Sequence, residues 1–120
     1  MRVVLRNPNA NDGRDFGYSL TVGREYEVVG ICADHYRLFN DKDEPILYDP
    51  CCFEVTDPTE PEFWVSKLGA EGERYAHPPE WSATGYFERW HDGVPEVKVG
   101  FWAELHRLYP WTAKARLRET

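Results

Sequence analysis

The chain has 120 residues, of which 42% are hydrophobic and 15% aromatic, and this is enough to bury one core. Its formal net charge is -7, from 14 basic and 21 acidic side chains. Because affinity for nucleic acid comes from lysine and arginine side chains that neutralise phosphates, this charge disfavours a nucleic-acid partner and favours a basic protein partner. No window reaches the roughly 18 apolar residues of a membrane span, and an odd set of three cysteines favours a reducing cytoplasm over a disulfide framework.

The first half of the chain has the pattern of short antiparallel strands. Residues 2–6 alternate as an edge strand does, and a polar loop follows over residues 9–18. Runs of β-branched and aromatic residues, separated by turn-forming residues, then recur at 26–31, 36–39, 46–48 and 53–55. We therefore expect a small antiparallel barrel, to which residues 63–68 add one more strand.

The hydrophobic period changes in the second half. Residues 69–79 show no sustained period and are predicted to form a loop. A short helix is predicted over residues 82–91, and a main helix over residues 95–109, where proline and glutamate open the first turn. An apolar stripe on the main helix comprises Val97, Phe101, Leu105 and Leu108. We expect Pro110 to end that helix and the last ten residues to be a frayed end.

These elements predict an α+β, mainly β, fold in a single domain over residues 1–120. Residues 1–68 would form the barrel, and residues 79–110 would form a helical extension packed on it.

Acidic residues gather at the predicted hairpin tip after residue 39. Asp41, Asp43 and Glu44 suit a solvated turn, and an exposed acidic finger that binds a basic partner is the functional alternative. The polar break at Asp34 and His35 is a further candidate contact. We expect charge reversal at the three hairpin acids to weaken partner binding and to leave thermal stability almost unchanged.

Neither the histidines nor the cysteines form a recognised catalytic or metal-binding pattern. The four histidines lack the i, i+4 spacing of a helical metal site, so no metal is expected. Cys51 or Cys52 could be drawn with His35 and Asp34 as a nucleophile, base and orienting acid, but no local signature supports this. Buried, inert thiols are favoured, and a redox role for the cysteine pair is left open. We predict no catalytic residue and no cofactor.

Five tryptophans are many for a chain of this length. Trp90 and Trp102 lie on predicted helix faces and are expected in the core. Trp81 and Trp111 stand beside prolines in irregular segments, so they are the better candidates for anchors in a binding face.

Four segments together resemble small bacterial SH3-like barrel proteins. They read LTVGREYEV at residues 20–28, YRLFND at 36–41, PILY at 45–48 and FEV at 53–55. The likeness covers about a third of the chain, and its motif is structural. The aromatic segment over residues 79–96 is similar to the helical tail of some small immunity-type proteins of bacterial toxin systems.

The resemblance implies a cytoplasmic immunity or inhibitor protein that binds and neutralises a cognate toxin domain through an acidic surface, without chemistry of its own. Because SH3-like barrels serve many functions, two alternatives stay open. One is a Tudor-like or KOW-like adaptor that binds a peptide or protein, and the other is a small enzyme. The oligomeric state is not predicted.

Overall fold

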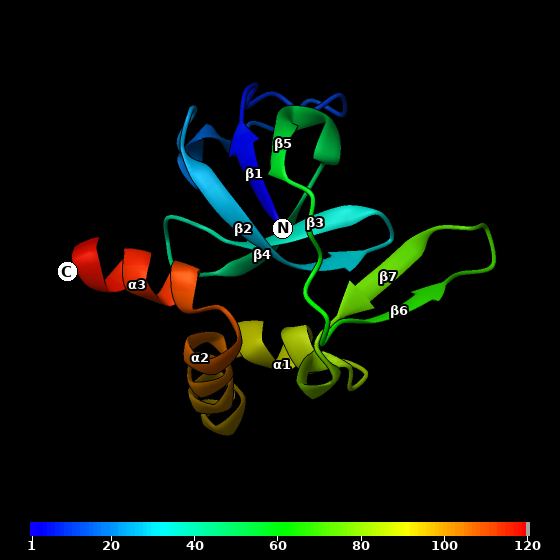
Figure 1. Cartoon of the computed structure of the whole chain (residues 1–120), viewed down its shortest axis with the longest axis vertical. Coiled ribbons are helices and arrows are strands. Elements are labelled where there is room, and N and C mark those ends of the chain that lie inside the picture. The colour runs from blue at the N-terminus through cyan, green and yellow to red at the C-terminus, as the bar shows by residue number, and fades with distance from the viewer. Residues whose placement is uncertain (120) are drawn as a thin grey trace. The chain divides into compact units, whose positions relative to one another are not determined.

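The computed structural model describes residues 1–119, with side chains described as far as residue 116. Two compact units divide the chain: Met1–His77, here called the strand unit, and Pro78–Thr120, here called the helical unit. The strand unit contains β1 (Arg2–Leu5), β2 (Glu25–Cys32), β3 (His35–Phe39), β4 (Pro45–Tyr48), β5 (Phe53–Asp57), β6 (Val65–Leu68) and β7 (Arg74–His77). The helical unit contains the short 3-10 helix η3 (Pro79–Trp81), α1 (Tyr86–His91), α2 (Pro95–Leu108) and α3 (Pro110–Glu119), as labelled in Figure 1.

The long strand β2 is the hub of the sheet. Its first half pairs with β1, where Tyr26 faces Val3, and its second half pairs with both β3 and β7. The register between β2 and β3 shifts between Val28 and Gly30. On the other edge of β2, the pairing with β1 stops at Glu27, and β7 pairs farther along at Ile31. A Cβ atom at Gly30 would lie 3.4 Å from the Ala76 carbonyl oxygen, which is the near limit of an ordinary van der Waals contact with the β7 backbone.

The sheet has seven antiparallel strands and is not closed into the expected barrel. Its main path runs β4-β3-β2-β1-β5, and β7 and β6 branch from β2. Within the strand unit no pairing joins β4 to β5, which remain edges, and β6 is the edge of the branch. The structure therefore confirms an α+β, mainly β, fold, and the barrel remains a finer prediction.

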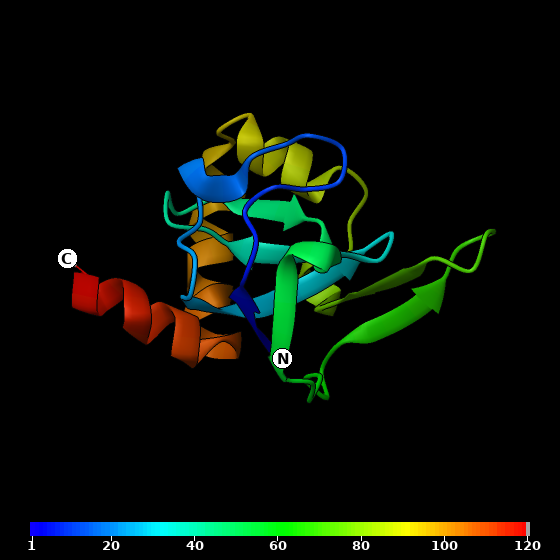
Figure 2. The same cartoon turned by 90° about the horizontal axis from the view of Figure 1, so that it is seen from above.

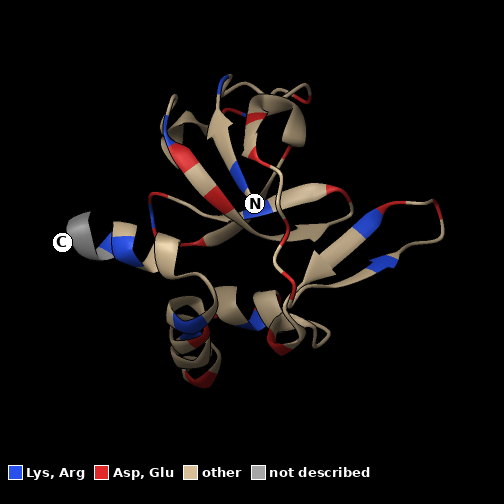
Figure 3. Ribbon diagram, viewed as in Figure 1, with Lys and Arg blue, Asp and Glu red and all other residues tan. Residues whose placement is uncertain are grey.

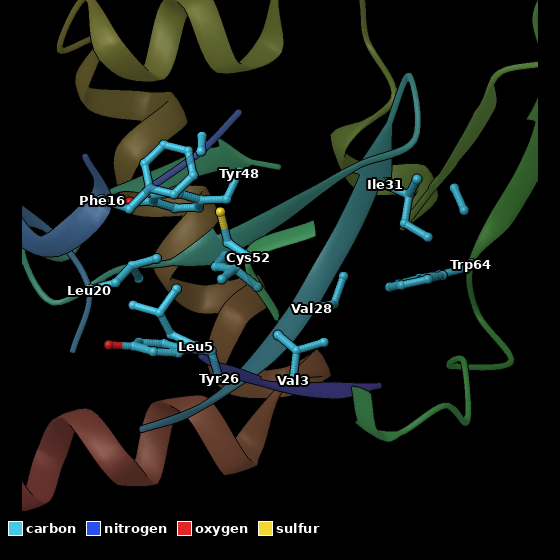
Figure 4. Close-up of a cluster of buried hydrophobic side chains, with 13 residues drawn as sticks. Val3, Leu5, Phe16, Leu20, Tyr26, Val28, Ile31, Tyr48, Cys52 and Trp64 are labelled. Carbon is cyan, nitrogen blue, oxygen red and sulfur yellow. The ribbon is translucent and has the colours of Figure 1, made fainter. Parts of the chain in front are cut away.

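The core of the strand unit gathers the inward-facing side chains of nearly all its strands. Leu5, Val28 and Leu38 are completely buried, and the Phe16 ring packs edge-on against Tyr48 with centroids 4.8 Å apart. Figure 4 shows this cluster, with Trp64 at the end nearest Ile31 of β2. The polar loop over residues 9–18 is thus tied down by Phe16, whereas Tyr18, the other aromatic residue expected to hold it, is 81% exposed.

The β6–β7 hairpin is the part of the strand unit that differs most from the sequence prediction. The strand predicted over residues 63–68 is present as β6, but the predicted loop over residues 69–79 contains β7, so that prediction was wrong there. Figures 1 and 2 both show the hairpin extending away from the other strands of the unit. We call it the β6–β7 arm.

The helical unit contains both predicted helices and one more. The short helix starts later than predicted, at Tyr86, and the main helix covers Pro95–Leu108. The chain turns out of helical geometry at Tyr109, and Pro110 then begins α3 instead of opening a frayed end. The expectation failed because a proline that cannot continue one helix is well suited to the first turn of the next.

Candidate partner-binding site

The turn between β3 and β4 is built by Asn40, which is almost completely buried. Its side-chain oxygen accepts hydrogen bonds from the backbone N–H groups of Lys42 (2.9 Å) and Glu44 (3.0 Å). Its side-chain amide donates to the Tyr48 hydroxyl at 3.1 Å. Asp43 adopts a left-handed conformation with φ of 60°, which aspartate tolerates better than most residues. The predicted acidic hairpin is therefore a fixed turn.

Asp41 points back into its own unit instead of serving as a free acidic contact. Its carboxylate accepts hydrogen bonds from Thr21 Oγ1 (2.7 Å), Tyr26 Oη (2.8 Å) and Arg24 Nη1 (3.2 Å). Burial, and to a lesser extent the Asp41 carboxylate, raise the pKa of Tyr26 to about 12, so its hydroxyl remains a donor at neutral pH. Of the three predicted hairpin acids, Asp43 is exposed, Glu44 is partly exposed and Asp41 is a structural ligand of the segment before β2.

Asp34 and His35 lie at the other end of β3. Ala33 and Asp34 have φ values of 47° and 67°, the pattern of a tight hairpin turn with two left-handed residues. The Asp34 side chain accepts a hydrogen bond from the backbone N–H of Arg74 (2.9 Å), and its own N–H donates to the Arg74 carbonyl (3.0 Å). His35 Nδ1 lies 2.9 Å from the Ala33 carbonyl oxygen. Asp34 thereby fastens β7 to the β2–β3 turn.

The structure does not bring the two predicted acidic turns together. They flank the five-residue strand β3, which at about 3.4 Å per residue separates them by roughly 17 Å. Each turn also uses one aspartate for internal hydrogen bonds. The two turns are therefore separate candidate contacts.

The base of the β6–β7 arm is held in the core of the strand unit. Trp64 and Ala76 belong to the core cluster, and the Arg74 guanidinium makes a two-pronged ion pair with the Glu60 carboxylate. Arg74 also donates to Ser66 Oγ at 2.9 Å. The hydrogen bonds from Arg74 lower the pKa of Glu60, while Glu60 raises the pKa of Arg74. This clamp, which we call the Glu60–Arg74 clamp, fixes the direction in which the arm leaves the sheet.

The outer part of the arm is exposed on both faces. All four residues of β6 are exposed, including the apolar Val65 (46%) and Leu68 (71%). Figure 3 shows acidic residues in the segment that enters β6 and in the turn that leaves it; these are Glu60, Glu62, Glu71 and Glu73. The sequence predicted a strand at β6 and the acidic residues that flank it. It did not predict that β6 is the outer strand of a hairpin, because β7 was predicted as a loop.

Trp81 is a core residue of the helical unit and not an exposed anchor. It is 3% exposed and stacks on Phe101 (4.7 Å between ring centroids) and Tyr109 (5.7 Å). Trp90 is buried as predicted, whereas Trp102 is only partly buried. Trp111 is 37% exposed, so of the two predicted anchors only Trp111 is exposed.

Buried polar atoms in the helical unit include several without a hydrogen-bond partner in the described part of the chain. They are the indole nitrogens of Trp81 and Trp90, the Tyr86 hydroxyl and Glu104 Oε2. Burial raises the pKa of Glu104, and the nearby Glu80 carboxylate adds to this, against opposing effects of Trp81 and Arg107. Burial, with the Glu104 charge, raises the pKa of Tyr86 to about 12. The rings of Trp81, Tyr86 and Trp90 belong to one aromatic cluster with Phe101, so these polar atoms lie in a packed core.

No group of three or more histidine, cysteine, aspartate or glutamate side chains within residues 1–119 could hold a metal ion. Cys51 is exposed and Cys52 is buried. Burial and the adjacent Cys51 raise the pKa of the Cys52 thiol to about 11, so this thiol is protonated at neutral pH. His35 and Asp34 hydrogen-bond to backbone atoms, as described above.

Comparison with known proteins finds no matching family model, no matching curated protein and no matching solved structure. Among the helices that the structure describes, none is both long enough and apolar enough to cross a membrane.

Proposed function

We propose that this chain is a cytoplasmic binding protein of the toxin-immunity type, which neutralises a basic partner domain by covering it with the acidic strand unit. The observation that carries the proposal is the division of charge between the two units. The strand unit holds 8 basic and 15 acidic residues, a net charge of -7, whereas the helical unit holds 6 of each. The whole net charge of the protein therefore belongs to one unit, whose field attracts a basic surface.

The proposal includes the finer fold suggested by the resemblance. On this view the strand unit is an SH3-like barrel variant that stays open because the β6–β7 arm occupies the edge of β2 beyond β1. The open arrangement supports binding over catalysis, since it offers backbone edges and charged turns to a macromolecule.

The test is co-expression with the product of the reading frame next to this gene. We expect the chain to restore growth of cells that make that product, and the two proteins to co-purify as a complex with a measurable Kd. Absence of both protection and complex would contradict the proposal.

Matched charge reversals locate the binding unit. Glu62→Lys with Glu71→Lys changes the strand unit by the same charge as Glu88→Lys with Asp92→Lys changes the helical unit, and all four side chains are exposed. We expect the first pair to weaken the complex at least about tenfold and the second pair to change it little. Equal weakening by both pairs would show that the strand unit is not the binding surface.

A peptide-binding adaptor is the second candidate, and the exposed β6 edge favours it. An adaptor would bind an isolated peptide as tightly as the domain that contains it and would not protect cells from a toxin. These two measurements separate it from an inhibitor.

A further inference from the structure

We propose that the outer edge of β6 binds an extended segment of the partner as an added antiparallel strand, and that this segment carries lysine or arginine at both ends and an uncharged centre. The inference rests on the proposed function and names the surface and the chemistry of its partner. Three observations on the arm support it: the direction of the backbone groups, the exposure of β6 and the position of the acids.

The direction of the backbone groups follows from the register of the hairpin. The N–H of Gly69 donates to the carbonyl of Glu73 at 2.7 Å, and the β6–β7 pairing continues from there with Leu68 opposite Arg74. Hydrogen-bonded and non-hydrogen-bonded pairs alternate along an antiparallel ladder, so Lys67 and Val65 face β7. The N–H and C=O groups of Ser66 and Leu68 therefore point to the outer edge, where β6 pairs with no described strand.

This edge is only partly protected against pairing. Its four-residue length and the charge of Lys67 limit the pairing, but within β6 no proline blocks the edge. Leu68 and Val65 add exposed apolar surface on opposite faces of the strand, which an added strand would partly bury.

A second copy of the chain is a poor occupant because of charge. An antiparallel copy must pair outward-facing residues with outward-facing residues, which leaves two registers that use most of β6. Pairing Ser66 with Leu68 of the copy sets Lys67 opposite Lys67. Pairing Ser66 with Ser66 sets Lys67 opposite Val65, and it brings Glu62 of each copy near the turn that holds Glu71 of the other. Like charges directly opposite each other are destabilising, so Lys67 disfavours the first register, and the acidic segments that approach each other disfavour the second.

A segment with basic ends removes this repulsion. Its ends would lie beside the acids that flank β6, and its uncharged centre would lie beside Lys67. The backbone hydrogen bonds supply affinity, and the paired charges select the partner and fix its register.

Hydrogen exchange on the full-length chain tests the proposal with two synthetic peptides. The basic peptide is Lys-Arg-Thr-Val-Thr-Val-Arg-Lys with blocked ends, and the control peptide has glutamate at the four charged positions. We expect the basic peptide to slow exchange of the Ser66 and Leu68 amides at least about tenfold, with the Val65 and Lys67 amides already slow without it. The acidic peptide should change none of them.

Two substitutions separate backbone pairing from simple charge attraction. Ser66→Pro removes one outward donor, and we expect it to weaken binding of the basic peptide about tenfold, while Ser66→Ala keeps the donor and binds normally. Glu62→Lys with Glu71→Lys should lose the basic peptide and gain the acidic one. If Ser66→Pro proves unfolded by circular dichroism, the exchange pattern of the wild type decides the question alone.

The proposal is overturned if the basic peptide fails to bind the wild type, or binds without protecting Ser66 and Leu68. It is also overturned if the partner domain binds Ser66→Pro and wild type equally well; in that case the proposed function stands and the β6 edge is excluded. Failure of any partner domain to bind the wild type would instead contradict the proposed function.

Discussion

The carboxylate of Asp41 accepts hydrogen bonds from three side chains that lie 15 to 20 positions earlier in the chain. Hydrogen bonds to a charged acceptor are stronger than neutral ones, and removal of that acceptor leaves the partly buried Tyr26 hydroxyl without this partner. The neighbouring Glu44 contributes its backbone N–H to the turn, and within the described residues its side chain makes no hydrogen bond or ion pair. Two acids three positions apart therefore have different roles.

This difference corrects the expectation that reversing all three hairpin charges would leave stability unchanged. We expect Asp41→Ala to lower the free energy of unfolding by about 2 kcal/mol, because it removes the acceptor of three hydrogen bonds. Glu44→Ala, the matched control, should change it by less than about 0.5 kcal/mol. Urea unfolding of both variants measures the difference. Similar values for the two variants would mean that the Asp41 network is not formed in solution.

Glu104 in α2 makes the free energy of unfolding depend on pH in the opposite direction from most acidic residues. Its pKa is raised above the ordinary value of 4.5 mainly by burial, with Glu80 adding to this and Trp81 and Arg107 opposing it, so the folded protein favours the protonated form. The stabilisation is fully present below pH 4.5 and is lost as the pH rises through the higher pKa of the folded state.

We therefore expect Glu104→Gln to raise the thermal midpoint at pH 7 and to leave it unchanged near pH 4. Scanning calorimetry at the two pH values measures this. Glu96→Gln, at an exposed position in the first turn of the same helix, is the control and should not raise the midpoint at pH 7. A lower midpoint for Glu104→Gln at pH 7 would indicate that the charged form is stabilised by the fold.

At the scale of elements, the sequence predicts the strands and helices whose hydrophobic residues repeat with a regular period. Residues 20–57 alternate strongly enough to predict four strands, and the stripe of α2 predicts its length to within one residue. β7 has only four residues, and Ala76 is its one fully buried side chain. Its pairing depends on Ile31 and on Asp34, which is 40 positions from Arg74, and no local pattern encodes such a contact.

The same limit applies to the candidate site. The sequence does not distinguish Asp34, Asp41 and Asp43, because each lies in a polar segment typical of a turn. Only their contacts with distant parts of the chain differ. Arg74 engages Asp34, the segment before β2 engages Asp41, and Asp43 stays exposed. The composition therefore predicted acidic residues as candidate partner contacts, but it did not predict which of them are exposed to solvent.

The Glu60–Arg74 clamp should control the arm without controlling the fold. We expect Glu60→Gln to speed exchange of the β6 and β7 amides and to change the overall melting temperature little, because both partners of the ion pair are about one-third exposed. Glu62→Gln, two positions away, is the control. Unchanged exchange in the arm of Glu60→Gln would show that the core contacts of Trp64 and Ala76 are sufficient.

The clamp also has a defined pH range. The pKa of Glu60 is lowered by its hydrogen bonds from Arg74, so the clamp is present above the ordinary value of 4.5 and is lost as the pH falls through the lower folded value. The arm of the wild type should then exchange as fast as that of Glu60→Gln.

At the scale of the whole molecule, charge is the property that separates the two units. Electrostatic attraction to a partner acts mainly on the rate of association, and salt screens it over about 8 Å at physiological ionic strength. The contribution of the strand unit should therefore be visible in kinetics.

We expect the association rate constant with the partner domain to fall about tenfold between about 0.05 and 0.5 M salt, with a smaller change in the dissociation rate. Surface plasmon resonance on the full-length chain measures both. For Glu62→Lys with Glu71→Lys the salt dependence should become shallower, and for Glu88→Lys with Asp92→Lys it should stay as in the wild type. A salt-independent association rate would remove electrostatic steering from the mechanism.

The open edge of β6 favours aggregation at high protein concentration, because an unpaired strand is a template for aggregation. The glutamates on either side of it then serve as gatekeepers, since their repulsion keeps one copy from stacking on the next while the edge stays open to a basic strand. Removal of those charges, by substitution or by acid, would turn a recognition surface into a seed for fibrils. Solubility of the free protein and recognition of its partner would thus depend on the same exposed side chains, Glu62 and Glu71.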